Sequence, residues 1–394
     1  MKRFLLIGDG MADDPGPNAC LCRAKTPYMD RLAAKGRLGR VITIPAGMEA
    51  GSDVAILGIL GYAPETYHAG RGPLEAVGLG VDVAEDEVVF RCNLVWLDQD
   101  RMGDYSAGGL SDEEGHRLIL DLQEALGEDG VRFVPGVGYR HLLVLRTEDP
   151  EALVSTRCKP PHSITGQAFS RFLPQGPQGS VLLDLMEKAQ EILRDQEVNV
   201  ARRRKGLPNA TAIWPWGGGC RAHLPSFESM WGLRAAVISA VSLVKSIGQL
   251  AGMDVIHVEG ATGYLDSNLA GKVEASLRFL REGGDLAIVH VEAPDEAGHH
   301  KNAEEKVQAI ERFDREVVGG ILEATEGWDR RFLVLSDHRT PVTVGDHTPD
   351  WVPWVISDGG RPGDMGTFHE MMCAETPCLD SGPAILRLFL RSCE

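Results

Sequence analysis

Three short apolar runs, each followed within a few residues by acidic or histidine side chains, constrain the fold of this chain most strongly. The runs and the polar residues after them are 3–7 before Asp9, 286–291 before Asp295, and 332–335 before Asp337 and His338. A short, fully apolar run is typical of a strand buried on both faces of a parallel sheet. Because the carboxyl ends of parallel strands form the ligand-binding edge of an open α/β sheet, we expect these polar side chains to converge there.

The stretches between these runs carry helical patterns. Apolar residues recur at helical spacing in residues 27–35, 270–281 and 303–321. Strand patterns that alternate with helical patterns are typical of βαβ units. The sequence therefore predicts an α/β fold with a mostly parallel sheet flanked by helices.

The middle of the chain has a different character. Its patterns are shorter strands at 88–97 and 141–145, a helix at 111–126 and a long charged helix near 181–204. A chain of 394 residues also exceeds the size at which one hydrophobic core stops growing. We therefore expect a smaller α+β domain at residues 73–214, inserted into a discontinuous catalytic domain formed by residues 1–72 and 215–394.

The formal net charge of −17 excludes two classes of partner. Nucleic-acid backbones and anionic membranes would be repelled at long range, and the longest apolar stretch, 235–244, is too short to span a bilayer. A small anionic substrate stays compatible, because bound cations and arginines can invert the potential inside one cleft. The apolar run after Met1 stops at Gly8, too early for a signal peptide, so we expect a cytoplasmic protein.

Carboxylate and imidazole side chains form the strongest chemical signal. They are Asp9, Asp295, His299, Asp337, His338 and His347. If Asp295 lies in a helix, His299 is one turn further along the same face, so one ion could bind both. Such ligands suit Mn²⁺, Zn²⁺ or Mg²⁺. Any one of these residues alone would be interpreted as a turn or cap residue, but polar groups after three strand-like runs predict a centre for two divalent ions.

Ser52 is the candidate nucleophile. It lies directly before an apolar run that reaches Leu60, so it is either an N-cap residue or a reactive hydroxyl at the same helix end. Both interpretations place Ser52 where free N–H groups and the helix dipole favour a phosphoryl group. Coordination to a divalent cation would activate the hydroxyl.

These residues, in this order, resemble the alkaline phosphatase superfamily. Four further segments are similar to the archaeal-type cofactor-independent phosphoglycerate mutases: Gly70-Arg71-Gly72-Pro73-Leu74-Glu75-Ala76, Phe90-Arg91-Cys92-Asn93, Gly260-Ala261-Thr262-Gly263-Tyr264, and the run from Val289 to His299, which reads VHVEAPDEAGH. The similarity runs nearly end to end, and the last segment is the most specific. The stretch 339–346 before His347 matches no family hallmark.

The resemblance implies an isomerase of glycolysis and gluconeogenesis that interconverts 3-phosphoglycerate and 2-phosphoglycerate. It implies two divalent metal ions, with Mn²⁺ favoured over Zn²⁺ or Mg²⁺, and neither 2,3-bisphosphoglycerate nor a nucleotide. One ion would be held by Asp9, Ser52, Asp337 and His338, and the other by Asp295, His299 and His347. Ser52 would carry the phosphoryl group as phosphoserine. The inserted domain would act as a lid that closes over the substrate.

Arginine and histidine side chains are the candidates for binding a small phosphorylated carboxylic acid, because guanidinium groups pair with carboxylates and phosphates in bidentate geometry. The candidates are Arg71 and Arg91, within the matching segments, followed by Arg140, His141, Arg157 and His162. Lys245 and Lys272 are both candidates for the general acid. The basic run 202–205 predicts a solvated helix end.

Three other functions stay open at this point. A related phosphotransferase such as a homoserine kinase would need an ATP site, and no phosphate-loop motif is present, since Gly271-Lys272 lacks the upstream glycine. A metal-dependent phosphatase would use the same centre and release phosphate. A non-catalytic metal-binding scaffold would have no use for Ser52.

Overall fold

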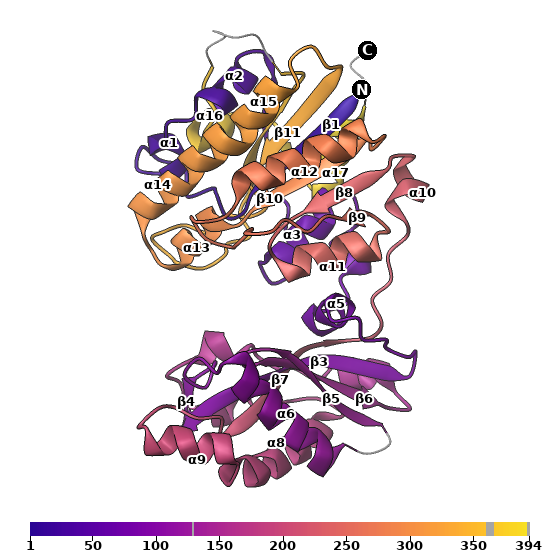
Figure 1. Cartoon of the computed structure of the whole chain (residues 1–394), viewed down its shortest axis with the longest axis vertical. Helices are drawn as coiled ribbons and strands as arrows, with labels where there is room; N and C mark the ends of the chain where they lie inside the picture. Colours follow the sequence, from indigo (N-terminus) through magenta and orange to yellow (C-terminus); the bar gives the residue numbers. More distant parts are fainter. Residues whose placement is uncertain (128–129, 360–365, 392–394) are drawn as a thin grey trace. The chain divides into compact units, whose positions relative to one another are not determined.

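The computed structural model describes residues 1–127, 130–359 and 366–391. The chain forms two compact units: Met1–His68 with Leu224–Glu394, and Ala69–His223 (Figure 1). The second unit interrupts the first in the sequence. Its bounds lie a few residues outside the range 73–214 that the sequence predicts for an inserted domain.

The first unit is built on one mixed sheet. Its strands, in spatial order, are β13 (Cys378–Leu379), β2 (Arg37–Val41), β12 (Val352–Ser357), β11 (Arg330–Leu335), β1 (Lys2–Gly8), β10 (Leu286–Val291), β8 (Ala235–Ile238) and β9 (Asp254–Val255). The pairs from β11 through β9 are parallel, whereas β12 pairs antiparallel with both β11 and β2. The mostly parallel sheet predicted by the sequence is confirmed.

The three apolar runs are the central strands β1, β10 and β11, which lie side by side (Figure 1). Every residue of β10 and β11 is buried, which requires cover on both faces of the sheet. On one face Phe4 of β1 stacks on Phe332 of β11, with ring centroids 5.1 Å apart. Since all three strands run in the same direction, their carboxyl ends open at one edge.

Helices cover this sheet. Those of the first unit are α1 (Cys20–Arg23), α2 (Pro27–Lys35), α3 (Ser52–Ile59), α4 (Pro64–Tyr67), α10 (Phe227–Trp231), α11 (Ser242–Leu250), α12 (Leu269–Arg281), α13 (Ala293–His299), α14 (Ala303–Arg312), η3 (Phe313–Gly319), α15 (Gly320–Ala324), α16 (Glu370–Ala374) and α17 (Gly382–Leu390). The predicted helices at 27–35, 270–281 and 303–321 are confirmed, although the last has a π-helical segment, η3, in its middle. In the described parts of the chain, no helix has the length and apolar character needed to cross a bilayer.

The second unit has a smaller antiparallel sheet. Its strands are β3 (Glu87–Asp98), β4 (Arg101–Asp104), β5 (Val131–Val137), β6 (Arg140–Arg146) and β7 (Ala212–Gly219), and its helices are α5 (Arg71–Gly78), α6 (Asp112–Leu126), α7 (Pro150–Val154), η1 (Pro161–Ile164), η2 (Phe169–Phe172), α8 (Gly179–Arg194) and α9 (Glu197–Arg204). Strand β3 pairs with β4, β6 and β7. Helix α6 begins with a capping box in which Ser111 and Glu114 exchange hydrogen bonds. The predicted α+β character is confirmed.

Two local predictions in this unit are wrong. The single helix expected near 181–204 is two helices, because the side-chain amide of Asn199 donates to the carbonyls of Leu193 and Ala210 and so fixes a turn between α8 and α9. The basic run at 202–205 is also not wholly solvated. Arg202 is buried, with its guanidinium paired to Glu114 at 2.7 Å and donating to the carbonyl of Pro208.

Candidate metal centre

The ends of the three central strands bring the predicted ligands together. Asp9 directly follows β1, Asp337 follows β11, and Asp295 lies in the first turn of α13, just after β10. Gly10 has a φ of +55°, and a β-carbon there would lie 2.3 Å from an oxygen of Asp295. This glycine therefore permits the close approach of the β1 and β10 loops.

Asp9 and Asp337 each present one oxygen that has no hydrogen-bond partner among the described residues. Asp337 uses Oδ1 to accept the backbone N–H groups of Gly10 at 3.0 Å and His338 at 2.9 Å, which leaves its Oδ2 unpaired. Both carboxylates are at most 3% exposed. Buried carboxylate oxygens without donors are costly unless a cation occupies the space between them.

Three histidines present their Nε2 atoms to the same region. The Nδ1 atoms of His299, His347 and His338 lie 3.1–3.3 Å from the oxygens of Gly345, Ala50 and Thr340 respectively. Such contacts orient imidazole rings in metal sites. The Nε2 atoms of His299 and His347 are only 2.9 Å apart, and each lies within 3.5 Å of Asp295.

His338 lies between the two groups of ligands. Its Nε2 atom is 3.4 Å from the nearer oxygens of both Asp9 and Asp337, while its ring centroid is 4.0 Å from that of His347. Two clusters have ligand atoms that all lie within 4.8 Å of one another: Asp295, His338 and His347, and Asp9, His290 and Asp337. The donor set therefore fits two divalent cations.

Ser52 lies at the edge of this cluster. It is the first residue of α3, after Gly51 at the N-cap position, and its Oγ is 3.1 Å from Nε2 of His338. The N–H groups of the first helical turn have no intrahelical partner. The hydroxyl, the N-terminus of α3 and the ligand cluster thus lie together.

The electrostatics of the centre indicate uncompensated negative charge. Burial, together with the neighbouring Asp337 and Asp295 carboxylates, raises the pKa of Asp9 well above its usual value. Burial opposes ionisation of Asp295, yet hydrogen bonds with His299 and His347 hold its pKa well below its usual value. Burial lowers the pKa of His338 to about 4, so this imidazole is neutral and keeps a lone pair for a cation.

Two residues of the centre were missed by the sequence analysis. His290 and Glu292 flank Val291 at the end of β10, and both are buried. Their alternation within the run from Val289 to His299 places both side chains on the same face of the strand, which was the signal available in the sequence.

The two lysine candidates for the general acid differ in their surroundings. Lys272 has no exposed surface, and its ammonium group donates to the carbonyl of His290 and to Glu292, both at 2.7 Å. Lys245 lies in α11 and is partly exposed. Lys272 is therefore enclosed beneath the centre, whereas Lys245 is accessible to solvent.

Three of the six predicted substrate-binding residues of the second unit gather around Trp216 of β7. The guanidinium carbons of Arg91 and Arg71 lie 4.5 and 5.8 Å from its ring centroid, and the ring of His162 lies 5.5 Å from it. Burial lowers the pKa of Arg91, and the nearby cationic groups of Arg71 and Arg140 lower it further, although Glu75 pairs with Arg91 at 3.0 Å. Several cationic groups at one place would favour an anion.

The remaining two candidates have other surroundings. His141 is 1% exposed, its Nδ1 accepts the backbone N–H of Gly136, and burial lowers its pKa to about 3. Arg157 is exposed, and its backbone forms an isolated bridge with Gln175. No described contact links either side chain with Trp216.

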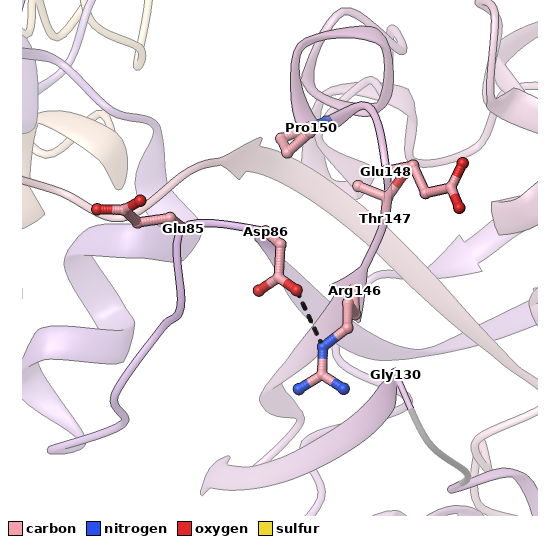
Figure 2. A pocket seen from close by; sticks show the side chains of 7 residues that line it. All are labelled: Glu85, Asp86, Gly130, Arg146, Thr147, Glu148 and Pro150. Atoms are coloured by element: carbon pink, nitrogen blue, oxygen red, sulfur yellow. Dashed lines mark ion pairs between the residues drawn. The ribbon is translucent and has the colours of Figure 1, made fainter.

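A cavity of about 590 Å³ in the second unit is lined by different residues (Figure 2). Its walls include Glu85, Asp86 and Glu148, and the one lining arginine, Arg146, is paired with Asp86 at 3.3 Å. This acidic lining would repel a phosphorylated acid. The cavity is therefore distinct in character from the group around Trp216.

Comparisons with known proteins agree with this site. Residues 33–199 match the family model described as 2,3-bisphosphoglycerate-independent phosphoglycerate mutase. A protein of that name from Methanosarcina mazei is 46% identical over 368 residues, with 92% of each chain covered, and one from Methanothermobacter thermautotrophicus is 44% identical over 393 residues, covering 94% of this chain and 96% of the relative.

Solved structures show the same fold. The PH0037 protein from Pyrococcus horikoshii has a TM-score of 0.80 at 29% identity and covers 99% of this chain and 96% of its own. The cofactor-independent phosphoglycerate mutase from Thermoplasma acidophilum has a TM-score of 0.64 at 24% identity, with 99% of each chain covered. Ser52 lies beside the ligand cluster, and the chain is 44–46% identical to the relatives from Methanosarcina mazei and Methanothermobacter thermautotrophicus over nearly its whole length. The chain therefore belongs to the 2,3-bisphosphoglycerate-independent phosphoglycerate mutase family.

Proposed function

We propose that this protein interconverts 3-phosphoglycerate and 2-phosphoglycerate through a phosphoserine on Ser52. The observation that carries the proposal is the contact between Ser52 Oγ and His338 Nε2 at 3.1 Å, at the N-terminus of α3, in a chain so similar to mutases throughout its length. A buried centre that positions a hydroxyl beside several metal ligands suits transfer of a phosphoryl group.

We assign the ligands to two divalent ions, with Mn²⁺ as the favoured metal. Asp9, Ser52, Asp337 and His338 would hold one ion, and Asp295, His299 and His347 the other. When bound, the ions neutralise the charge of the transferring phosphoryl group and lower the pKa of the serine hydroxyl. The unpaired oxygens of Asp9 and Asp337 and the convergent Nε2 atoms support this assignment.

The residues of the chain would carry out the transfer in two balanced steps. The Ser52 alkoxide forms a bond to phosphorus as the ester oxygen of the substrate leaves, and the leaving oxygen takes a proton from a general acid, for which accessible Lys245 is the remaining candidate. The N-terminus of α3 stabilises the phosphoryl charge. The other hydroxyl of the retained glycerate then gives its proton to the Lys245 amine and attacks phosphoserine, and the bond between phosphorus and Oγ breaks to regenerate the Ser52 alkoxide.

The substrate itself needs cationic partners. We propose that Arg71, Arg91, Arg140 and His162 bind its anionic groups, while Arg157 and His141 are weaker candidates because of their surroundings. A mutase must keep the glycerate away from water, since water attacking phosphoserine would give a phosphatase. The lid role of residues 73–214 is part of this proposal.

An assay coupled to enolase tests the function. Metal-free protein is supplied with Mn²⁺ and 3-phosphoglycerate, without 2,3-bisphosphoglycerate or ATP, and formation of phosphoenolpyruvate is followed. Steady product formation is expected. Release of inorganic phosphate in its place would identify a phosphatase, and activity that appears only with ATP and an alcohol would identify a kinase.

A further inference from the structure

A buried chain of polar groups extends away from the metal centre behind Asp9. Nε2 of His290 lies 3.2 Å from Oδ2 of Asp9, and Nδ1 of the same ring lies 3.2 Å from Oε1 of Glu292. The other oxygen of Glu292 accepts from the ammonium of Lys272 at 2.7 Å. All four side chains are at most 5% exposed, and only Asp9 belongs to the assigned ligands.

The far end of this chain is held firmly. Oε1 of Glu292 accepts from the hydroxyl of Ser239 at 2.9 Å and from the backbone N–H of Ala240 at 2.7 Å. An ionised carboxylate only accepts hydrogen bonds, so the neighbouring Nδ1 of His290 must be the donor to Glu292. The ring orientation of His290 is therefore set by groups that do not touch the metal centre.

The two carboxylates of the centre are supported in corresponding ways. Asp337 has Oδ1 fixed by two backbone N–H groups and Oδ2 unpaired. Asp9 has Oδ2 facing His290, while its Oδ1 accepts no hydrogen bond from the described residues and lies 3.4 Å from Nε2 of His338. His290 and the ligand His338 thus face different oxygens of the Asp9 carboxylate.

We infer that His290 is a positioning residue for Asp9: held by Glu292 and Lys272, it fixes Oδ2 of Asp9 so that Oδ1 is aimed at the metal. The inference deepens the proposed function, because it rests on the assignment of Asp9 as a ligand. Outer partners of this kind stabilise the productive orientation of a ligand and affect metal affinity by about 10–100-fold. Lys272 is accordingly part of this support and not the general acid.

Binding of Mn²⁺ to the metal-free protein, followed by the EPR signal of free Mn²⁺ without substrate, tests the inference. His290→Phe keeps a planar ring but removes the donor, so the dissociation constant of one of the two ions should rise about tenfold or more. Saturation should still reach two ions. His290→Gln, which restores an N–H donor, should recover most of the affinity.

Two further variants protect the test against a general loss of folding. Ser239→Ala removes one hydrogen bond to Glu292 and the 3.2 Å contact of its hydroxyl with Nδ1 of His290, but keeps the imidazole ring. It should raise the same dissociation constant by a few fold, as expected from about 1 kcal/mol per hydrogen bond. Ser276→Ala removes a buried hydroxyl from α12, the helix that carries Lys272, and should leave both affinities unchanged.

Three results would overturn the inference. Unchanged affinities in folded His290→Phe and Ser239→Ala would show that Asp9 needs no such support. Loss of one ion at saturation in His290→Phe, without recovery in His290→Gln, would make His290 itself a ligand. A wild-type protein that binds no Mn²⁺ would remove the basis of the inference. The binding experiment contains no substrate, so its result does not depend on mutase activity. A protein that binds Mn²⁺ but lacks mutase activity would refute the proposed function, and the measured affinities would still decide the inference about His290.

Discussion

The hydroxyl of Ser52 lies 3.1 Å from Nε2 of His338, although the two residues are 286 positions apart in the sequence. The contact joins the first turn of α3 to the loop that follows β11. Nδ1 of His338 is engaged by Thr340 on the other side of the ring, so Nε2 is directed at Ser52. This relationship makes Ser52 the first residue to test.

Replacement of Ser52 by alanine should abolish phosphoryl transfer while leaving the protein folded. We expect at least about a 10⁴-fold loss of kcat, as is typical when a covalent nucleophile is removed. Mass spectrometry of the wild-type protein, quenched during turnover, should detect phosphate on Ser52. Ser246→Ala, which removes another buried serine hydroxyl in α11, is the matched control and should keep its activity. A phosphorylated residue other than Ser52 would contradict the assignment.

Removal of divalent metal should lower stability as well as activity. Without cations, the buried carboxylates of Asp9 and Asp337 repel each other, and one oxygen of each has no donor among the described residues. Mn²⁺ at about 100 times its dissociation constant should stabilise the folded state by about 2.7 kcal/mol per independent site. Differential scanning calorimetry with EDTA and then with added Mn²⁺ measures this. An unchanged melting temperature would argue against a metal centre here.

Replacement of Arg91 by methionine should weaken substrate binding more than it slows chemistry. Arg91 is buried beside Trp216, with Arg71 and Arg140 close enough to affect its pKa. Loss of a charged hydrogen bond costs about 1.5–3 kcal/mol, which predicts a rise in KM of roughly 10–100-fold.

The control for Arg91→Met must remove the same charge from an exposed site. Arg204→Met does so at the end of α9 and should leave KM unchanged. Because Arg91 also pairs with Glu75, circular dichroism must show that the variant is folded. Equal KM values in the two variants would remove Arg91 from the proposed site.

The convergence of three aspartates could be predicted from the sequence because each follows a recognisable strand. Asp9, Asp295 and Asp337 come after mostly apolar runs, and parallel strands bring such residues to one edge. Ser52 was recognisable because it opens a helix. These residues could be recognised from the strand or helix next to each of them, and the parallel sheet determines where those strands end in space.

What the sequence could not predict depends on tertiary contacts. The alternation of His290 with Glu292 places both on one face of the strand, but nothing in the sequence indicates that Nε2 of His290 faces Asp9. Lys272 occupies an ordinary position in a helical pattern, yet its side chain is fully buried and its ammonium group donates to the carbonyl of His290 in β10. The break between α8 and α9 likewise arises from one amide, that of Asn199, which bonds to residues outside its own helix.

A buried carboxyl away from the centre, Asp314 of η3, should make stability depend on pH. It accepts the backbone N–H groups of Met29 at 2.7 Å and Tyr28 at 3.2 Å, and burial raises its pKa to about 7. An unfolded aspartate has a pKa of about 3.9, so between these values the folded state binds more protons than the unfolded state. The stabilisation from this group is therefore complete below about pH 4 and is lost as the pH rises to about 7.

The variant Asp314→Asn isolates this effect, because its amide cannot ionise. Its one oxygen can still accept from Met29, and the lost bond from Tyr28 lowers stability equally at every pH. Wild-type protein should lose about 4 kcal/mol between pH 4 and 8 through this group, and the variant should lose correspondingly less. Melting temperatures measured across this range test the difference. Asp100→Asn, at an exposed position, should follow the wild-type profile. Parallel profiles for Asp314→Asn and wild type would mean that Asp314 is ionised throughout, with its charge stabilised by the N–H groups at the start of α2.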